Sequence, residues 1–364
     1  MIPLAKPILG KREKQLINEV IDSGIIASGK YVEKFEQMFA KVSKAKFSVV
    51  CSNGTTALNT ALLACGIKPG DKVITTPFTF IATSNSILYC GAKPIFADID
   101  PKTYDIDPKS VEKILKKEKN VKAVICVHLY GLPCDMGELL KLKKKYKFVL
   151  IEDACQAHLA KYKNKTVGTI GDAGCFSFYA TKNMTTGEGG AVLTNNSKIN
   201  DLSRKIINHG RMAHYGHDML GYNFRLTNVC AAIGIAQCEQ IEKWTKQRIA
   251  NAKKLSEGLK DVSFIETPFV PKGYTHVYHQ YTVRVKDGLR DKLMKYLKDN
   301  GIGCGIHYPE VLHRQPLYKN LGYKNNLCPV AEQAAKEVLS LPVHPSLTAK
   351  DINTIIKTIK GFKK

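Results

Sequence analysis

The sequence has no long hydrophobic run and no signal-like N-terminus. Its longest apolar stretches are strand-sized, well short of the roughly 20 residues that a membrane helix needs. Pro3 and Pro7 interrupt the segment where a secretory signal would be uninterrupted and apolar. We therefore expect a cytoplasmic protein without a membrane partner. With 27 Gly and 15 Pro in 364 residues, neither a collagen-like nor a disordered chain is indicated.

Acidic residues are few. Asp and Glu number 32 against 55 Lys and Arg, for a net charge of +23. Such an excess is compatible with nucleic-acid binding. However, the lysines are spread along most of the chain, and the sequence has no RNP-like aromatic pattern, zinc-finger spacing or recognition helix. We interpret the excess as a solvated basic surface and expect no nucleic-acid partner.

No Cys-x-x-Cys pair occurs, although the chain has 11 cysteines. The nearest neighbours in sequence are Cys126/Cys134 and Cys230/Cys238, and several cysteines lie inside apolar segments. Buried reduced thiols behave as small hydrophobic side chains. We therefore predict neither disulfides nor a metal site.

The apolar pattern predicts an α/β fold. Residues 11–43 show two amphipathic helical patterns, separated at Gly29. Short apolar runs separated by helical segments then predict seven buried strands. They are Phe47–Cys51, Lys72–Thr75, Lys93–Phe96, Val121–Val127, Phe148–Ile151, Gly174–Phe178 and Ala191–Leu193. Strands that alternate with helices favour a mainly parallel sheet between helices.

A second, smaller α/β region is predicted after a long helix that runs from Gln237 toward Leu259. This region combines a strand at 280–285 with two helical patterns, one of them beginning at an N-cap candidate, Thr348. We place the boundary near residue 245, which gives domains at 1–245 and 246–364.

The first segment that indicates chemistry is Ser52-Asn53-Gly54-Thr55-Thr56, which follows a strand and opens a helix. Free amides at a helix N-terminus, together with the helix dipole, suit a phosphate group. Ordinary helix capping explains the same residues. The Gly-Lys-Ser/Thr of a Walker loop is missing.

A pair of acids, Glu152-Asp153, is placed at the C-terminal end of a buried strand, where α/β sheets have their ligand crevice. A carboxylate there could pair with a cationic ring nitrogen, bind a metal or cap the next helix.

Lys182 differs from the other lysines. It lies in a compact loop after an apolar strand, among small, aromatic and hydroxylated residues, with Gly187, Gly189 and Gly190 following. A lysine in such surroundings can have a depressed pKa and form a Schiff base with an aldehyde.

A phosphate-binding turn, an acid at a strand end and a loop lysine together suggest pyridoxal phosphate (PLP). This cofactor needs an anchor for its phosphate, a carboxylate for its pyridine nitrogen and a lysine for its aldehyde carbon. The sequence resembles the sugar aminotransferase family often called DegT/DnrJ/StrS, of the aspartate-aminotransferase fold (PLP fold type I). The resemblance runs nearly end to end through eight motifs. They are Ile2–Pro7, Gly54–Leu58, Pro77–Thr83, Phe96–Asp100, His128–Gly131 with Glu152–Ala154, Thr181–Asn183 and Gly221–Thr227.

The resemblance implies roles for the residues around the cofactor ring. Lys182 would carry the cofactor as a Schiff base and shuttle a proton, and Asp153 would keep the pyridine nitrogen protonated. Gln156 would lie near the phenolic oxygen. Phe80 would stack on the ring, with ordinary core packing as its alternative.

The phosphate ligands implied by the resemblance are Gly54, Thr55, Thr56 and Ser177, joined by Asn223 of a neighbouring subunit. Each active site would then need both chains of a homodimer. Arg225 would either assist substrate binding or form a structural ion pair.

For the nucleotide-linked sugar, the resemblance points to His307 and Tyr308, and further to His313, all in the smaller region. A buried, hydrogen-bonded histidine is the alternative for His307.

The implied reaction is transamination. Some relatives that have histidine in place of the lysine are dehydratases, whereas this chain has Lys182. An amino acid, with L-glutamate expected, would donate the amine, and a nucleotide-linked ketosugar would accept it. The alternatives are a PLP-dependent sugar deoxygenation and, from another class, a basic regulatory protein on the same scaffold.

Overall fold

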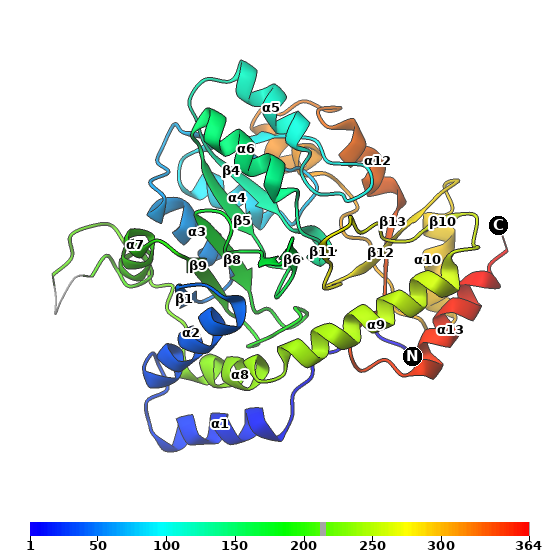
Figure 1. The fold of residues 1–364 in the computed structure, drawn as a ribbon, viewed down its shortest axis with the longest axis horizontal. Helices are drawn as coiled ribbons and strands as arrows, with labels where there is room; N and C mark the ends of the chain where they lie inside the picture. Colours follow the sequence, from blue (N-terminus) through cyan, green and yellow to red (C-terminus); the bar gives the residue numbers. More distant parts are fainter. Residues whose placement is uncertain (212–215, 364) are drawn as a thin grey trace.

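The computed structural model describes residues 1–211 and 216–363. Its centre is a seven-stranded sheet in the order β1-β9-β8-β5-β4-β2-β3 (Figure 1). The strands are β1 (Phe47–Cys51), β2 (Lys72–Thr75), β3 (Lys93–Phe96), β4 (Val121–Val127), β5 (Val149–Asp153), β8 (Ala173–Ser177) and β9 (Gly190–Thr194). All seven strands predicted from the apolar runs are therefore present.

The sheet is mainly parallel, as predicted. The pairs β2–β3, β2–β4, β4–β5 and β5–β8 are parallel, and β9 runs antiparallel to both of its neighbours. The alternation of side chains in β4 shows why its strand is apolar throughout. Val124 and Cys126 enter the core on one face, and Ala123 and Ile125 enter the core on the other.

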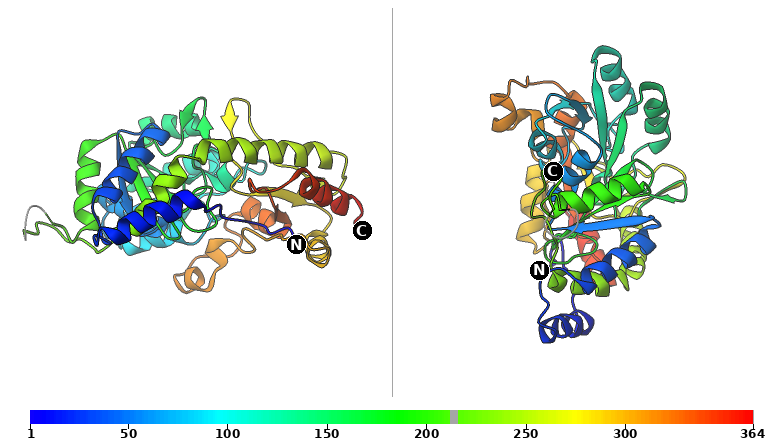
Figure 2. Two further views of the ribbon diagram at one scale, coloured as in Figure 1. Left: turned by 90° about the horizontal axis from the view of Figure 1, so that it is seen from below. Right: turned by 90° about the vertical axis from the view of Figure 1, so that its left-hand side faces the viewer.

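Helices cover both faces of the sheet (Figures 1 and 2). On one face pack α1 (Lys11–Asp22), α2 (Lys30–Ser43), α5 (Pro108–Lys117), α6 (Met136–Tyr146) and α8 (Asn228–Cys238). On the other face pack α3 (Gly54–Ala64), α4 (Ala82–Tyr89) and α7 (Ser197–Ile207). The two predicted N-terminal helices are confirmed, with Gly29 as the N-cap of α2.

The second region is built around a smaller antiparallel sheet, β10-β12-β13. Its elements are α9 (Ile241–Leu259), β10 (Ile265–Glu266), β12 (Tyr281–Val285), α10 (Arg290–Asp299), β13 (Val338–Leu341) and α13 (Ala349–Lys360). The long helix begins at Ile241, after a break that separates it from α8, so the predicted boundary at residue 245 falls inside α9. Thr348 caps α13 by accepting a bond from the Asp351 amide.

The N-terminus lies beside this second region rather than on the large sheet. The Ile2 amide donates to the Gly301 carbonyl, and the Gly303 amide donates to the Ile2 carbonyl, each at 2.8 Å. Residues grouped by sequence with the large domain therefore pair with the smaller region.

The remaining elements are short, and sequence periodicity did not reveal them. They are η1 (Leu129–Gly131), β6 (Lys161–Tyr162), β7 (Lys165–Thr166), β11 (Tyr274–Thr275), η2 (Leu312–Arg314), α11 (Pro316–Asn320) and α12 (Pro329–Glu337). Across residues 1–211 and 216–363, every helix is too short or too polar to cross a bilayer.

Candidate active site

Asp153 ends β5 at the carboxyl edge of the sheet and is 5% exposed. Its Oδ2 accepts a 2.7 Å hydrogen bond from the Thr83 hydroxyl of α4, and its Oδ1 accepts one from the Cys155 amide at 3.2 Å. Its backbone carbonyl accepts a 3.0 Å bond from the His128 amide. The carboxylate is therefore oriented from two sides, as a group that must meet a ligand in one direction requires.

Lys182 lies in the loop between β8 and β9, where its amide donates to the Tyr179 carbonyl at 2.9 Å. The side chain is half-buried. Desolvation of the amine lowers the pKa of Lys182, while the nearby Cys155 and Asp153 act in the opposite direction. A lowered pKa increases the fraction of neutral, nucleophilic amine.

The N-terminus of α3 faces this loop. Asn53 caps the helix by accepting from the Thr56 amide at 2.9 Å, and the Thr56 hydroxyl accepts from the Asn53 amide at 3.1 Å. The amides of Gly54 and Thr55 make no hydrogen bond to another described residue, as expected for the first turn of a helix. Asn53 and Thr56 therefore form a helix cap, and the amides of Gly54 and Thr55 are the groups that the phosphate interpretation would use.

Gly54 and Ser177 are in close contact. A Cβ added at Gly54 would lie 2.8 Å from the Cβ of Ser177 and 3.1 Å from Sγ of Cys155. Only glycine therefore fits at the first residue of α3.

The second region supplies Tyr308. The Gln156 amide nitrogen donates to the Tyr308 hydroxyl at 3.2 Å, and Gln156 Oε1 accepts from the Tyr130 amide at 2.8 Å. The Tyr308 ring lies 6.2 Å from the ring of Phe80, which is 56% exposed. Because more than half of the Phe80 side chain is exposed, its ring is accessible to a ligand.

His307 precedes Tyr308, and its Nδ1 lies 3.0 Å from the Ser340 hydroxyl. Its carbonyl accepts a hydrogen bond from the Tyr130 hydroxyl. Burial, together with the charge of Lys182, lowers the pKa of His307 to about 4. The imidazole is therefore neutral at pH 7 and lies within the electrostatic reach of Lys182.

Three of the predicted residues take part in none of the side-chain contacts described above. His313 is fully buried, and its Nε2 lies 2.9 Å from Oε1 of Glu332. Asn223 and Arg225 are exposed residues of a segment that pairs with the end of β1. Arg225 lies opposite Cys51 and donates to Oδ1 of Asn208 at 2.6 Å, and the Ser52 amide donates to the Phe224 carbonyl at 2.8 Å. The segment of Asn223 and Arg225 therefore runs beside the turn that opens α3.

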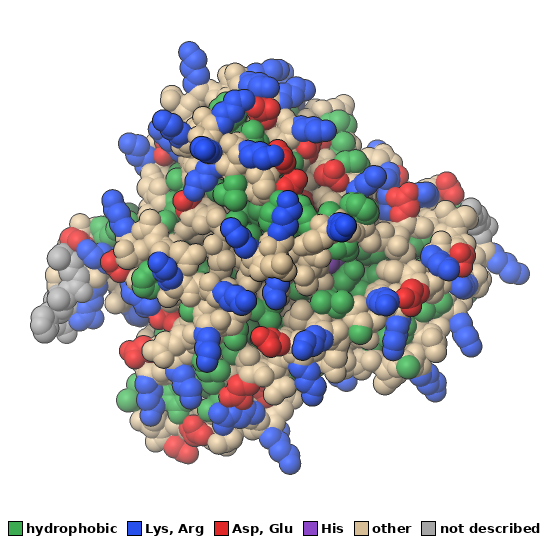
Figure 3. Space-filling model, in the orientation of Figure 1, with side chains coloured by type: hydrophobic (Ala, Val, Ile, Leu, Met, Phe, Trp, Pro, Cys, Tyr) green, Lys and Arg blue, Asp and Glu red, His purple; other side chains and the backbone are tan. Residues whose placement is uncertain are grey.

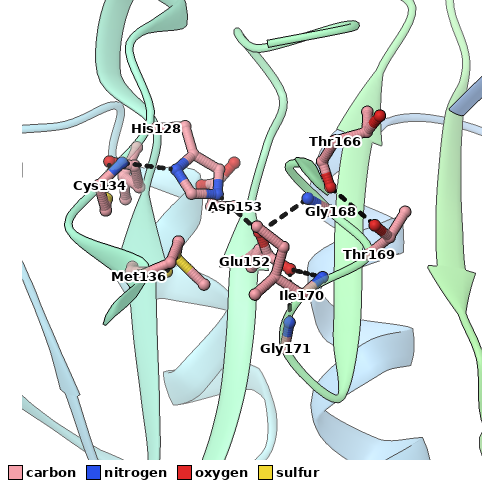
Figure 4. A network of polar contacts seen from close by, with 12 residues as sticks. His128, Cys134, Met136, Glu152, Asp153, Thr166, Gly168, Thr169, Ile170 and Gly171 are labelled. Atoms are coloured by element: carbon pink, nitrogen blue, oxygen red, sulfur yellow. Dashed lines mark hydrogen bonds and ion pairs between the residues drawn. The ribbon is translucent and has the colours of Figure 1, made fainter. Parts of the chain in front are cut away.

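Sequence reasoning missed two sets of polar contacts at the site. It gave no role to Thr83, although this residue closes the quoted segment 77–83. It also gave no role to His128, and for Glu152 it offered only the roles of an acid at a strand end. The two residues form a buried pair, with Glu152 directly before Asp153 in β5 (Figure 4). The signal that could have revealed this pair is that His128 and Glu152 are polar residues at the ends of two apolar strands.

A cavity of about 500 Å³ lies elsewhere in the described part of the chain. It is lined by Asp100, Asp105, Asp135, Phe269 and Tyr274 among others, and by none of the predicted site residues. The site is therefore recognised by its residues and not by cavity size.

Known proteins resemble this chain over nearly its whole length. The model of the DegT/DnrJ/EryC1/StrS aminotransferase family matches residues 7–360. The chain belongs to this family. Among its relatives, a protein of Geobacillus stearothermophilus named pleiotropic regulatory protein is 42% identical, with 96% of this chain and 93% of that protein covered. GDP-perosamine synthase of Escherichia coli O157:H7 is 38% identical, with 99% and 98% covered.

Solved structures agree with the assignment. DesV of S. venezuelae, solved in complex with a ketimine intermediate, superposes with a TM-score of 0.92 at 33% identity, covering 96% of this chain and 93% of that chain. This member of the DegT/DnrJ/EryC1/StrS family therefore has PLP fold type I and is a PLP-dependent nucleotide-sugar aminotransferase. The residues present fit the cofactor: a desolvated amine, an oriented carboxylate and a helix N-terminus with free amides.

Proposed function

We propose that the protein transfers the amino group of L-glutamate to a ketosugar linked to a nucleoside diphosphate. The observation that carries this proposal is that Lys182, whose pKa desolvation lowers, lies within the electrostatic reach of the buried carboxylate of Asp153. An amine and an acid in these two positions are what a PLP-dependent transaminase requires. A relative whose name contains a GDP-linked sugar supports the choice of acceptor.

PLP, when bound, supplies an electron sink for the reacting carbon. Lys182 would then move a proton between the substrate carbon and the cofactor, for which a neutral amine is needed. Asp153, oriented by Thr83, would hold a proton at the pyridine nitrogen. Gln156 would lie at the phenolic oxygen and Phe80 on the face of the ring.

The cofactor phosphate would be held by the amides of Gly54 and Thr55 and by the Ser177 hydroxyl. Thr56 would act mainly through the cap, since its hydroxyl is engaged with Asn53. Asn223, which is exposed, would complete the phosphate site from a partner subunit of a homodimer, as the family resemblance implies.

For the nucleotide-linked sugar we propose His307 and Tyr308, which bring the second region to the cofactor. Arg225, also exposed, would assist from the partner subunit. His313 would act only indirectly, because its Nε2 faces Glu332 in the core.

The test is a two-stage reaction. PLP-loaded protein mixed with L-glutamate should release 2-oxoglutarate, up to one equivalent per site, with loss of the yellow colour. Addition of a nucleotide-linked ketosugar should restore the colour and yield an amino sugar. Lys182→Ala should abolish both stages, whereas the exposed Lys144→Ala should not. Turnover of the ketosugar without 2-oxoglutarate would instead identify deoxygenation.

The second candidate is a regulatory role, favoured by the name of the 42% identical relative and by the net charge of +23. Against it, Lys and Arg are scattered over the visible face, with acidic residues between them (Figure 3). Salt-dependent binding to DNA by the PLP-free protein would support this candidate.

A further inference from the structure

Glu152 is a fully buried carboxylate that accepts four hydrogen bonds (Figure 4). Its Oε2 accepts from Nε2 of His128 at 2.9 Å and from the Gly168 amide at 2.7 Å. Its Oε1 accepts from the amides of Ile170 and Gly171, both at 2.7 Å. A carboxylate has about four acceptor sites, so this one is saturated.

The protonation of His128 follows from its second contact. Its Nδ1 accepts a 3.0 Å bond from the Cys134 amide, so the proton of a neutral ring is on Nε2, which donates to Glu152. The His128 amide also donates to the Asp153 carbonyl at 3.0 Å. His128, the residue directly after β4, therefore contacts Glu152 through its side chain and Asp153 through its backbone amide.

The segment that supplies the other donors can approach only because it is rich in glycine. A Cβ at Gly171 would lie 2.5 Å from the Leu150 carbonyl oxygen, and a Cβ at Gly174 would lie 2.2 Å from that of Gly168. Gly168 itself has a φ of +82°, in the left-handed region. The chain therefore uses three glycines, spaced by three residues, to bring amides to one carboxylate.

Core packing alone does not explain why position 152 is an acid. Successive side chains of β5 alternate between the two faces, and Leu150 is the apolar neighbour of Glu152 on the same face. Asp153 projects to the other face, where Thr83 of α4 meets it. A buried carboxylate without a cation nearby is stable only when all of its hydrogen-bond donors are in place. The four donors therefore fix the position of Glu152 more tightly than packing would fix an apolar side chain.

We propose that Glu152 is a positioning residue for Asp153. Its hydrogen bonds hold His128 and the segment 168–171 against β5. They thereby fix the position and direction of the end of β5, from which Asp153 would contact the pyridine nitrogen of PLP. The inference rests on the proposed role of Asp153.

The test compares PLP with its 1-deaza analogue, in which a C–H group replaces the ring nitrogen. A residue that acts through Asp153 affects the affinity for PLP and spares the analogue, because the analogue has no nitrogen for Asp153 to hold. In Glu152→Gln the amide group opposes two of the four N–H donors. We expect its PLP affinity to fall about tenfold, as for other residues that orient a ligand-binding group, with the analogue affinity changed far less.

Two further variants complete the experiment. Glu36→Gln is the matched control, because Glu36 is also buried and accepts a 2.9 Å bond from the Val50 amide of the same sheet; its ratio of PLP to analogue affinity should equal that of the wild type. His128→Asn removes one donor of the four, because the shorter side chain ends near the position of Nδ1, and should change the ratio in the same direction as Glu152→Gln, by less. It also serves as the test if Glu152→Gln does not fold.

Equal losses for PLP and the analogue in Glu152→Gln, or an unchanged ratio in His128→Asn when that variant is the test, would overturn the positioning role. Asp153→Asn separates this outcome from a failure of the proposed function. If Asp153→Asn leaves the ratio unchanged, the assignment of Asp153 to the ring nitrogen is wrong. If it lowers the ratio while Glu152→Gln does not, only the inference about Glu152 is wrong.

Discussion

The hydroxyl of Thr83 donates a 2.7 Å hydrogen bond to Oδ2 of Asp153, across 70 residues of sequence. The bond joins α4 to the end of β5 and leaves the carboxylate with one preferred direction. A hydrogen bond to a charged group is stronger than one between neutral groups, so this contact is the main side-chain restraint on Asp153.

Thr83→Val removes that donor with little change in shape. We expect PLP affinity to fall about tenfold, ~1.4 kcal/mol, because the carboxylate loses a charge-assisted bond and its orientation. Titration of the PLP-free protein with cofactor measures the change. Thr75→Val is the control, since this buried threonine of β2 donates only to the Ile125 carbonyl. An equal loss in both variants would mean that the effect comes from the sheet and not from Asp153.

Gly54→Ala places a methyl group against Ser177 and Cys155. Because alanine normally favours a helix over glycine, we expect folding to be retained while PLP binding weakens. Gly361→Ala, with a φ of −82° and no backbone or side-chain atom closer than 3.4 Å, is the control. Cofactor titration and thermal unfolding of the PLP-free proteins separate the two effects. Unchanged PLP affinity in Gly54→Ala would place the phosphate elsewhere.

Lys182 predicts a pH dependence of stability. Its folded pKa is lowered, so between that value and the ordinary value of about 10.4 the unfolded chain binds more protons. The free energy of unfolding of the PLP-free protein should therefore rise with pH across this window. Lys182→Met should be more stable than the wild type below the window, with a difference that shrinks as pH rises. Denaturant titrations at several pH values test this, with the exposed Lys144→Met as control; parallel curves for Lys182→Met and wild type would contradict it.

The buried ring of His158 predicts a second pH dependence of stability, of the same sign but in the acidic range. The ring is 1% exposed among Phe39, Phe176 and Phe178, and neither nitrogen has a partner among the described residues. Burial, with the charge of Lys182 adding to it, lowers the pKa of His158 to about 3.

Below the ordinary histidine pKa of about 6.5 the unfolded chain therefore binds one more proton at this residue, and stability falls as pH decreases. His158→Met should reduce this slope by about 1.4 kcal/mol per pH unit between about pH 4 and pH 6. The exposed His217→Gln should leave the slope as it is. Urea denaturation across this range measures both, and an unchanged slope in His158→Met would show that the ring is protonated in the folded state.

The fold was predictable in most of its regular elements. Seven strands and both N-terminal helices follow from local apolar periodicity, which depends on neighbours along the chain. The two-residue strands β6, β7, β10 and β11 escaped, because so short a pairing leaves no pattern in sequence. The pairing of Ile2 with Gly301 and Gly303 escaped for a different reason, since it joins opposite ends of the chain.

The candidate site was predictable in its residue types but not in its contacts. Lys182, Asp153 and Gly54 were identified by their place after strands or before a helix, and the structure brings them to one edge of the sheet. His313 shows the limit: a histidine in a polar segment looks the same in sequence whether it meets a ligand or, as here, Glu332 in the core.

By itself, the sequence determined the order of strands and helices, the chemistry offered at each strand end and the resemblance that identified the cofactor, because all of these are written in runs of neighbouring residues. Only the tertiary structure decided that Thr83 holds Asp153 and that Glu152 collects the amides of residues 168–171. Those contacts depend on which strands lie side by side and on how closely a glycine-rich segment can approach them, and neither is a local property of the chain.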